Sequence, residues 1–424
     1  MTTSPNRGMW GSRLGFILAA AGSAVGLGNI WGFPTRVGQG GGAVFVVIYL
    51  FCIVLICAPI LVAEFVLGRG SRQSPVGAFK YFSSGTRWWW VGALGVVTSV
   101  AIVAFYSVIG GWTIGYVWYS ATGALSSGGE GAGDFFTRFT GNGFKGVFCT
   151  FLFLGLAAAS NIGGVRTGIE RVAKTLMPAL LVLLVLLAVR SLTLPGAAEG
   201  LAYYMRPDFS QAFNMSVFGA ALGQAFFSLS LGNGAMLTYG SYLRRSEGIG
   251  RVVLWVVLLD TFIALLAGLI IFPAGFSIAG FDPASTGPGL IFAVLPELFA
   301  TLVGGRLFGG AFFVLLVIAA LTSAISLLEV PVAHVIDRRQ WSRPKAVLVV
   351  SGSAFLLSIP CALGFGAVGS LTDFVPAQWG GNFLGLVATL CNNFSLPIGG
   401  MLIAIFVGYV WRVDRAVAEL LAEH

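Results

Sequence analysis

The sequence predicts an all-α integral membrane protein that crosses the bilayer ten times. Hydrophobic residues make up 57% of the 424 residues, charged residues only 9%, and the mean hydropathy is +0.91. Because a soluble domain has about 25% charged residues, this composition excludes a water-soluble globule. The long charge-free stretches suit helices of roughly 20 residues, and they are too long for the alternating strands of a barrel.

Ten apolar stretches lie between charged segments, and each is long enough to cross the bilayer. We place these spans at 14–34, 43–68, 88–120, 146–163, 175–192, 212–242, 252–278, 307–336, 346–366 and 382–411. The shorter apolar stretch at 287–300 is expected to form a loop helix. The first stretch follows Arg7 and Arg13 but continues to Pro34 without a cleavage site, so we interpret it as a span and not as a signal peptide.

The basic residues predict the orientation. With the N-terminus inside, only six of the 24 Lys and Arg residues fall outside, namely Arg36, Arg138, Lys145, Arg190, Arg206 and Arg306. The positive-inside rule therefore places both termini in the cytoplasm and the chain in the cell (inner or plasma) membrane. The net charge of +8 is not gathered in a basic domain, which argues against nucleic-acid binding.

The cysteines carry no recognisable chemistry. All five lie in apolar segments without CxxC or Cys/His spacing: Cys52, Cys57, Cys149, Cys361 and Cys391. We interpret them as packing residues.

Two spans are interrupted by glycine, the first at 22–29 (GSAVGLGN) and the sixth at 228–234 (SLSLGNG). Spans one and six of ten are equivalent positions in two halves that enter the membrane from opposite sides. This arrangement predicts an inverted repeat, 1–192 and 193–411, followed by a cytoplasmic tail, 412–424, with a binding site where the broken helices meet. The alternative is that the small residues only allow close helix packing.

Few ionisable residues lie within the spans, and such residues are functional candidates because their burial is costly. Asp260 is the strongest candidate, since it lies deep in the seventh span. Glu64 either holds backbone N–H groups of a broken helix or takes part in transport directly. Glu329 either has a function or extends to the cytoplasmic edge. The hydroxyls of Thr322 and Ser323 are hard oxygen donors of the kind that Na⁺ requires, although such groups often bond to their own helix.

Several motifs occur at these positions. Residues 22–34 read GSAVGLGNIWGFP, 226–234 read FFSLSLGNG, and shorter matches lie at Gly40-Gly41-Gly42-Ala43, Tyr106-Ser107, Gly111-Trp112, 168–171 (GIER) and 319–323. Together they resemble the bacterial branch of the neurotransmitter:sodium symporter family, over essentially the whole chain to about residue 411. The resemblance implies the leucine-transporter-type fold, a 5+5 inverted repeat with broken first and sixth transmembrane helices.

The resemblance also implies the binding residues. One sodium site would use Ala24, Asn29, Ser228 and Asp260. A second would use Gly22, Val25, Ala319, Thr322 and Ser323. The substrate pocket would be lined by Ser23, Ala24, Leu27, Gly28, Ile102, Tyr106, Phe227, Ser228, Ser230, Asn233, Ser323 and Leu327. A cytoplasmic gate would comprise Arg7, Trp10, Tyr242 and Asp337.

The sequence departs from the family pattern at several places. Gly32 stands where the family commonly has an arginine, and the acidic partner of the tenth span is replaced by Ala388 or a neighbour, which puts the usual outer salt bridge in doubt. Asn233 stands where a large apolar residue is frequent, which suggests a more polar side-chain pocket. Relatives have eleven or twelve spans, so the ten spans represent either a natural short form or a truncation.

The resulting prediction is secondary active transport of a small amino acid into the cell with Na⁺, by alternating access. Proton coupling through Asp260 or Glu329 is one alternative, and a receptor or scaffold that binds without transporting is another. An enzyme is not expected, because the chain has only His334 and His424 and no nucleophile, metal or nucleotide motif. Asp260 is expected to supply the balancing negative charge, so chloride is predicted not to be required; Ala264 lacks the acid that other chloride-independent relatives carry there.

Overall fold

The computed structural model describes residues 9–125, 131–207, 209, 214–278, 281–284, 290–301 and 304–422, and within them the chain is helical with no β-strand. The spans of the first half are formed by α1 (Arg13–Ala24), η1 (Gly28–Gly32) and α2 (Phe33–Gln39); α3 (Ala43–Cys52), η2 (Ile53–Cys57) and α4 (Ala58–Ser71); α6 (Trp89–Thr122); α8 (Gly143–Ile162); and η3 (Val165–Ile169) with α9 (Glu170–Ser191).

The remaining spans lie between Met215 and Val410. They are α11 (Met215–Ser228) with α12 (Ala235–Gly240); α13 (Ile249–Gly275); α15 (Gly305–Arg339); α16 (Arg343–Leu363); and α18 (Phe383–Thr389), η7 (Leu390–Ser395), α19 (Leu396–Ile405) and η8 (Phe406–Val410). The connecting helices are α5 (Pro75–Phe82), α7 (Ala132–Gly141), α10 (Ala197–Met205), α14 (Leu295–Thr301), α17 (Gly369–Thr372) and α20 (Val413–Leu421).

The described helices agree with the predicted spans. Eight are long and apolar enough to cross a membrane, and α1 with the helical segment Gly28–Gln39 forms a further span that is bent by 47°. The remaining predicted span, the sixth, is divided into α11 and α12. The loop helix expected at 287–300 corresponds to η5 (Leu290–Val294) and α14.

The fifth span begins ten residues earlier than predicted, at Val165 instead of 175. The predicted span begins at 175 because charged residues occur at 170–174. In the structure two of these charges pair with each other, since Lys174 Nζ lies 2.6 Å from Glu170 Oε1. Glu170 also accepts a bond of 2.6 Å from the backbone N–H of Gly11. These bonds let the helix start inside the charged segment.

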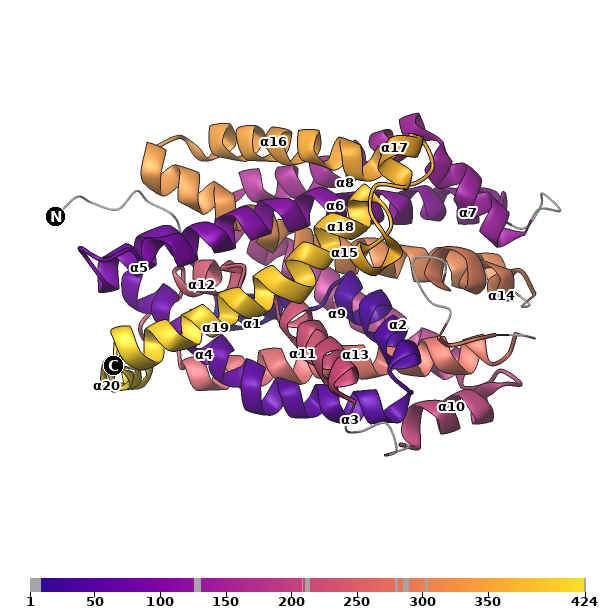
Figure 1. Cartoon of the computed structure of the whole chain (residues 1–424), viewed down its shortest axis with the longest axis horizontal. Coiled ribbons are helices and arrows are strands. Elements are labelled where there is room, and N and C mark those ends of the chain that lie inside the picture. Colours follow the sequence, from indigo (N-terminus) through magenta and orange to yellow (C-terminus); the bar gives the residue numbers. More distant parts are fainter. Residues whose placement is uncertain are drawn as a thin grey trace.

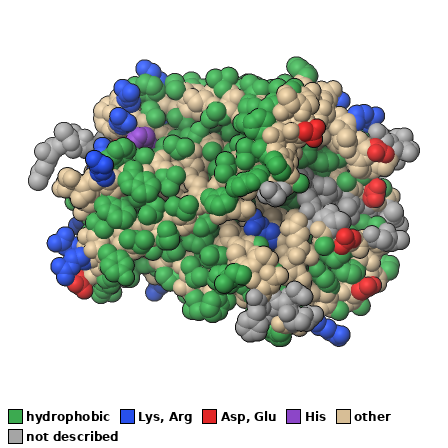
Figure 2. Space-filling view, in the orientation of Figure 1, with side chains coloured by type: hydrophobic (Ala, Val, Ile, Leu, Met, Phe, Trp, Pro, Cys, Tyr) green, Lys and Arg blue, Asp and Glu red, His purple; other side chains and the backbone are tan. Residues whose placement is uncertain are grey.

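The helices run along the long axis of the molecule, with connecting elements at its two ends (Figure 1). The α5 and α20 helices lie at one end, and α7, α10 and α14 lie at the other. Lys and Arg side chains gather over the first end, most of the visible Asp and Glu lie at the other, and hydrophobic side chains cover the surface between them (Figure 2). Among the eight long helices, α6 and α15 are the most deeply buried.

Candidate functional site

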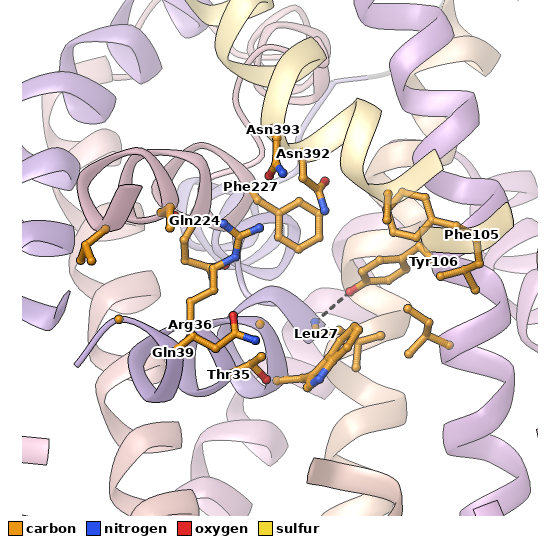
Figure 3. A pocket seen from close by; sticks show the side chains of 18 of the residues that line it. Leu27, Thr35, Arg36, Gln39, Phe105, Tyr106, Gln224, Phe227, Asn392 and Asn393 are labelled. Atoms are coloured by element: carbon orange, nitrogen blue, oxygen red, sulfur yellow. Dashed lines mark hydrogen bonds between the residues drawn. The ribbon is translucent and has the colours of Figure 1, made fainter. Parts of the chain in front are cut away.

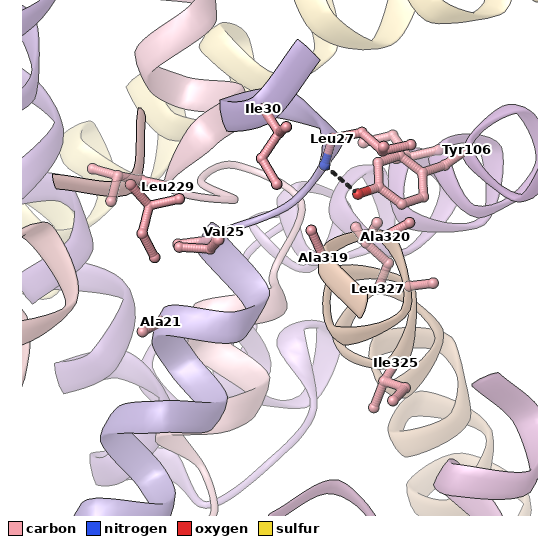
Figure 4. Packing of buried hydrophobic residues seen from close by; sticks show 14 of the residues in the cluster. Ala21, Val25, Leu27, Ile30, Tyr106, Leu229, Ala319, Ala320, Ile325 and Leu327 are labelled. Carbon is pink, nitrogen blue, oxygen red and sulfur yellow. Dashed lines mark hydrogen bonds between the residues drawn. The ribbon is translucent and has the colours of Figure 1, made fainter. Parts of the chain in front are cut away.

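The first span unwinds in the middle of the bundle. The α1 helix ends at Ala24, Val25 is extended (φ −79°, ψ 103°), and helical structure resumes at Gly28. Figure 4 shows the chain crossing between the two helical pieces, with Leu27 facing Tyr106. The unwinding releases main-chain carbonyls from helical hydrogen bonds at a buried position, so they need polar partners there.

The sixth span unwinds in a corresponding way between α11 and α12. Positive φ values occur at Ser230 (52°), Gly232 (81°) and Gly234 (80°), which glycine adopts without the penalty that a Cβ brings. The fully buried carboxylate of Glu64 accepts bonds from the N–H groups of Gly232 (2.7 Å) and Leu237 (3.3 Å). Of the two interpretations of Glu64, this geometry favours the one in which it holds the broken helix.

Asp260 lies beside the two breaks and is fully buried. Its Oδ1 accepts bonds from Asn29 Nδ2 (2.7 Å) and from the hydroxyl of Ser228 (2.9 Å). The hydroxyl of Tyr49 lies 3.5 Å from Oδ2. None of these partners carries a positive charge, and the ion pairs among the described residues do not include Asp260.

A buried carboxylate with only neutral partners is a site that attracts a cation. Asn29, Ser228 and Asp260, three predicted ligands of the first sodium site, are therefore together. Asn29 presents its nitrogen to Asp260, while its Oδ1 accepts the N–H of Gly26 at 3.2 Å. Because only an oxygen can accept the N–H of Gly26, this bond fixes the amide with its NH₂ toward Asp260. For Asn29 to offer its oxygen to a cation beside Asp260, the amide would have to rotate and give up this bond.

A second group of oxygens lies between α1 and α15. The hydroxyl of Ser323 is 3.3 Å from the carbonyl of Gly22, 3.0 Å from that of Ser23 and 3.2 Å from that of Val25. One hydroxyl hydrogen cannot satisfy three carbonyls. The hydroxyl of Thr322 is 3.0 Å from the carbonyl of Ala319. All five residues predicted for the second sodium site thus contribute to this arrangement of hard oxygens.

A small cavity of about 20 Å³ separates the two breaks. It is lined by most of the predicted substrate residues, namely Ser23, Ala24, Gly28, Ile102, Tyr106, Phe227, Ser230, Asn233, Ser323 and Leu327, together with Gly26. At its edge the N–H of Leu27 donates to the hydroxyl of Tyr106 at 2.9 Å. A carboxylate entering here would replace that bond by bonds to both groups. The cavity itself has room for about one water molecule, so its walls must separate to admit a larger ligand.

A wider vestibule of about 500 Å³ adjoins this cavity, and Leu27, Tyr106 and Phe227 border it (Figure 3). Phe227 lines both spaces and packs over Gly28, so its ring lies where it can separate them. Both Gly32 and Ala388, the positions where the family pattern is broken, line the vestibule. Among the described residues that line it, Arg36 is the charged one, and its Nη1 donates to the carbonyl of Ala220 at 3.1 Å.

The predicted cytoplasmic gate is assembled in part. The indole N–H of Trp10 donates to the carbonyl of Tyr239, and its backbone N–H donates to the carbonyl of Tyr242 at 3.4 Å. Asp337 accepts the backbone N–H of Ser74 at 2.9 Å. The fourth predicted member, Arg7, lies outside the described residues.

Glu329 is fully buried, so the interpretation that it extends to the cytoplasmic edge is wrong. Its Oε1 accepts the hydroxyl of Tyr242 at 2.6 Å, and its Oε2 pairs with Arg343 at 2.5 Å. Arg343 also donates to the carbonyl of Asn161. The carboxylate stays inside because Arg343, the first residue of α16, is brought next to it when the helices pack.

Sequence reasoning did not assign a role to Tyr49, Gln224, Arg36 or Arg343. Gln224 donates to the carbonyl of Gly28 at 2.7 Å and is buried, and Tyr49 contacts Asp260. The sequence could have indicated Arg36 as the arginine nearest to the one missing at Gly32. It lies four residues after Gly32 and therefore one turn further on the same helix face. The described residues contain no group of three His, Cys, Asp or Glu side chains that could hold a metal ion, so the candidate cation sites rest on neutral oxygens and Asp260.

Comparison with known proteins gives consistent matches. The model of the sodium:neurotransmitter symporter family matches residues 7–129 and 146–419. The uncharacterized sodium-dependent transporter YhdH of Bacillus subtilis is 39% identical over 98% of this chain and 89% of its own length. An uncharacterized sodium-dependent transporter of Haemophilus influenzae is 35% identical over 99% and 92%. The crystal structure of MhsT in complex with L-phenylalanine is similar with a TM-score of 0.91 and 45% identity, over 98% of this chain and 93% of MhsT.

Proposed function

The chain belongs to the sodium:neurotransmitter symporter family, and from that membership we propose that the cargo of this sodium-coupled symporter is a small α-amino acid carried into the cell. The similar structure of MhsT contains L-phenylalanine, which supports an amino acid as the ligand. The pairing of the Leu27 N–H with the Tyr106 hydroxyl supports a carboxylate at the edge of the small cavity. Broken-helix carbonyls nearby would accept the ammonium group.

The observation that carries the sodium coupling in this chain is the buried carboxylate of Asp260 among neutral partners. We place one Na⁺ there, with Asn29, Ser228 and the carbonyl of Ala24. A second Na⁺ would occupy the oxygens around Ser323 and Thr322. Each site consists of hard oxygen donors, and only the first contains a full negative charge, so the two ions would differ in their dependence on Asp260.

Chloride independence follows from the same carboxylate. A zwitterion adds no net charge, so Na⁺ at the first site needs one negative charge nearby, and Asp260 supplies it permanently. Ala264, one helical turn further, contributes no second acid. Asp260 would thus act both as a ligand and as the balancing charge.

The distribution of basic residues indicates the orientation in the membrane. The end of the molecule that holds α5 and α20 carries most of the visible Lys and Arg side chains (Figure 2). The positive-inside rule assigns that end to the cytoplasm. The vestibule at Arg36 would then open outward, which is the direction required for uptake.

Uptake into proteoliposomes tests the proposal. Amino-acid uptake should collapse when external Na⁺ is replaced by K⁺ and should be unchanged when chloride is replaced by gluconate. A proton gradient that drives full uptake without Na⁺ would instead establish the proton-coupled alternative. Binding of an amino acid without any concentrative uptake would support the receptor alternative.

A further inference from the structure

The side-chain amide of Asn233 lines the small cavity, and its hydrogens have no partner among the described residues. This residue is only 1% exposed and lines the cavity. It lies between Gly232 and Gly234, in the unwound part of the sixth span. Its backbone packs closely on α6, because a Cβ on Gly95 would lie 3.2 Å from the Asn233 carbonyl carbon and oxygen. The side chain is therefore held at a fixed place in the cavity wall.

The orientation of the Asn233 amide is fixed by its one hydrogen bond. Its Oδ1 accepts the backbone N–H of Ala235 at 2.8 Å, and only an oxygen can accept that hydrogen. The other end of the amide is therefore NH₂. Among the described residues, no acceptor bonds to this nitrogen, so Asn233 brings two unused donor hydrogens to the cavity.

The other polar side chains of the cavity are bonded within the protein. The Tyr106 hydroxyl accepts the N–H of Leu27, and its own hydrogen is assigned to the ligand's carboxylate. The hydroxyl of Ser23 donates to that of Ser326 at 2.6 Å. The hydroxyl of Ser230 donates to the carbonyl of Ser23 at 2.9 Å, and that of Ser323 lies among the α1 carbonyls. The remaining walls include the apolar side chains of Ile102 and Leu327. Apart from the Tyr106 hydroxyl at the edge, Asn233 thus supplies the unused side-chain donor among the described residues of this lining.

We propose that Asn233 selects the substrate side chain, so that this symporter prefers small, uncharged amino acids whose side chain carries a hydrogen-bond acceptor, a hydroxyl or a carboxamide. The inference rests on the proposed amino-acid transport and specifies its cargo. A buried donor without a partner costs free energy, which an acceptor on the substrate recovers and a methyl group does not. Charged side chains are disfavoured because no charged residue lines the small cavity.

Two isosteric pairs of amino acids test the proposal. L-threonine and L-valine differ by a hydroxyl in place of a methyl, and L-asparagine and L-leucine differ by a carboxamide in place of a branched alkyl end. The apparent Kd of each would be obtained from the thermal stabilisation of the purified full chain in NaCl. We expect the acceptor-bearing member of each pair to bind about tenfold to a hundredfold more tightly. Equal binding, or tighter binding of the apolar members, would overturn the proposal.

Two substitutions distinguish an effect of Asn233 on substrate preference from an effect on protein folding. Asn233→Leu removes the donor and should reverse the preference within each pair, and the ratio of two ligands on one variant is independent of the folded fraction. Asn233→Ala removes both amide hydrogens and adds no group that could accept a hydrogen from the ligand's hydroxyl or carboxamide, so it should abolish the preference. An unchanged ratio in both variants would overturn the role of Asn233. If no amino acid stabilises the wild type in Na⁺, the amino-acid proposal itself fails, which is a different outcome.

Discussion

Replacement of Asp260 by asparagine is the sharpest perturbation of the sodium site. The carboxylate is fully buried and its contacts, Asn29, Ser228 and Tyr49, are neutral, so Asp260→Asn removes the only formal charge among these groups. The substitution preserves the size of the side chain and one oxygen ligand. Its effect is therefore mainly electrostatic.

The magnitude follows from the burial of the site. Removal of one partner from a buried ion pair costs about 3–5 kcal/mol, because the remaining charge is left uncompensated. Asparagine retains one oxygen for the ion, so we take the lower end, about 3 kcal/mol, which corresponds to roughly a hundredfold weaker Na⁺ binding. Chloride near the site could restore part of this loss by supplying a negative charge.

The assay is a Na⁺ titration of uptake in proteoliposomes, in chloride and in gluconate. The wild type should give the same half-saturating Na⁺ concentration in both anions. In gluconate, Asp260→Asn should require about a hundredfold more Na⁺ than the wild type, so it should show almost no uptake at the Na⁺ concentration that half-saturates the wild type, and chloride should restore part of that uptake. The matched control is Asp134→Asn, which makes the same chemical change at an exposed position of α7. A chloride requirement in the wild type, or a normal titration of Asp260→Asn, would refute the role of this carboxylate.

Three further outcomes are expected. Ser323→Ala removes a hydroxyl from the second oxygen group and should raise the half-saturating Na⁺ concentration at least tenfold. The control Ser353→Ala, on the exposed face of α16, should have no effect. Equal Na⁺ titrations of the two variants would show that Ser323 is not a Na⁺ ligand. Tyr106→Phe should weaken amino-acid binding about tenfold and abolish discrimination against the decarboxylated amine, and an undiminished affinity of the wild type for that amine would contradict a carboxylate at this place. Glu64→Gln should lower the free energy of unfolding by about 1–3 kcal/mol in a thermal-shift measurement, since an amide can accept fewer N–H bonds from the broken helix than a carboxylate can. Unchanged stability would show that the bond to Gly232 is dispensable.

The places of the spans could be predicted because hydropathy acts along the chain. A helix that crosses the bilayer needs about 20 consecutive apolar residues whatever its neighbours are. The error at the fifth span arose where this local rule was overridden, because Glu170 and Lys174 neutralise each other and Glu170 also holds Gly11. Likewise, nothing near Glu329 in the sequence indicates Arg343 as its partner across the turn into α16.

The two glycine-rich interruptions, the apolar composition and the motif at residues 22–34 determined the membrane class, the broken spans and the family from sequence alone, because each is a local property of the chain. Only the tertiary structure decided which atoms meet. Asn29 reaches Ser228 across 199 residues and Asp260 across 231. It also decided that Oδ1 of Asn233 is used by Ala235, which leaves the amide hydrogens for a ligand. Hydrogen bonds depend on distances and directions between distant segments, and these exist only once the helices have packed.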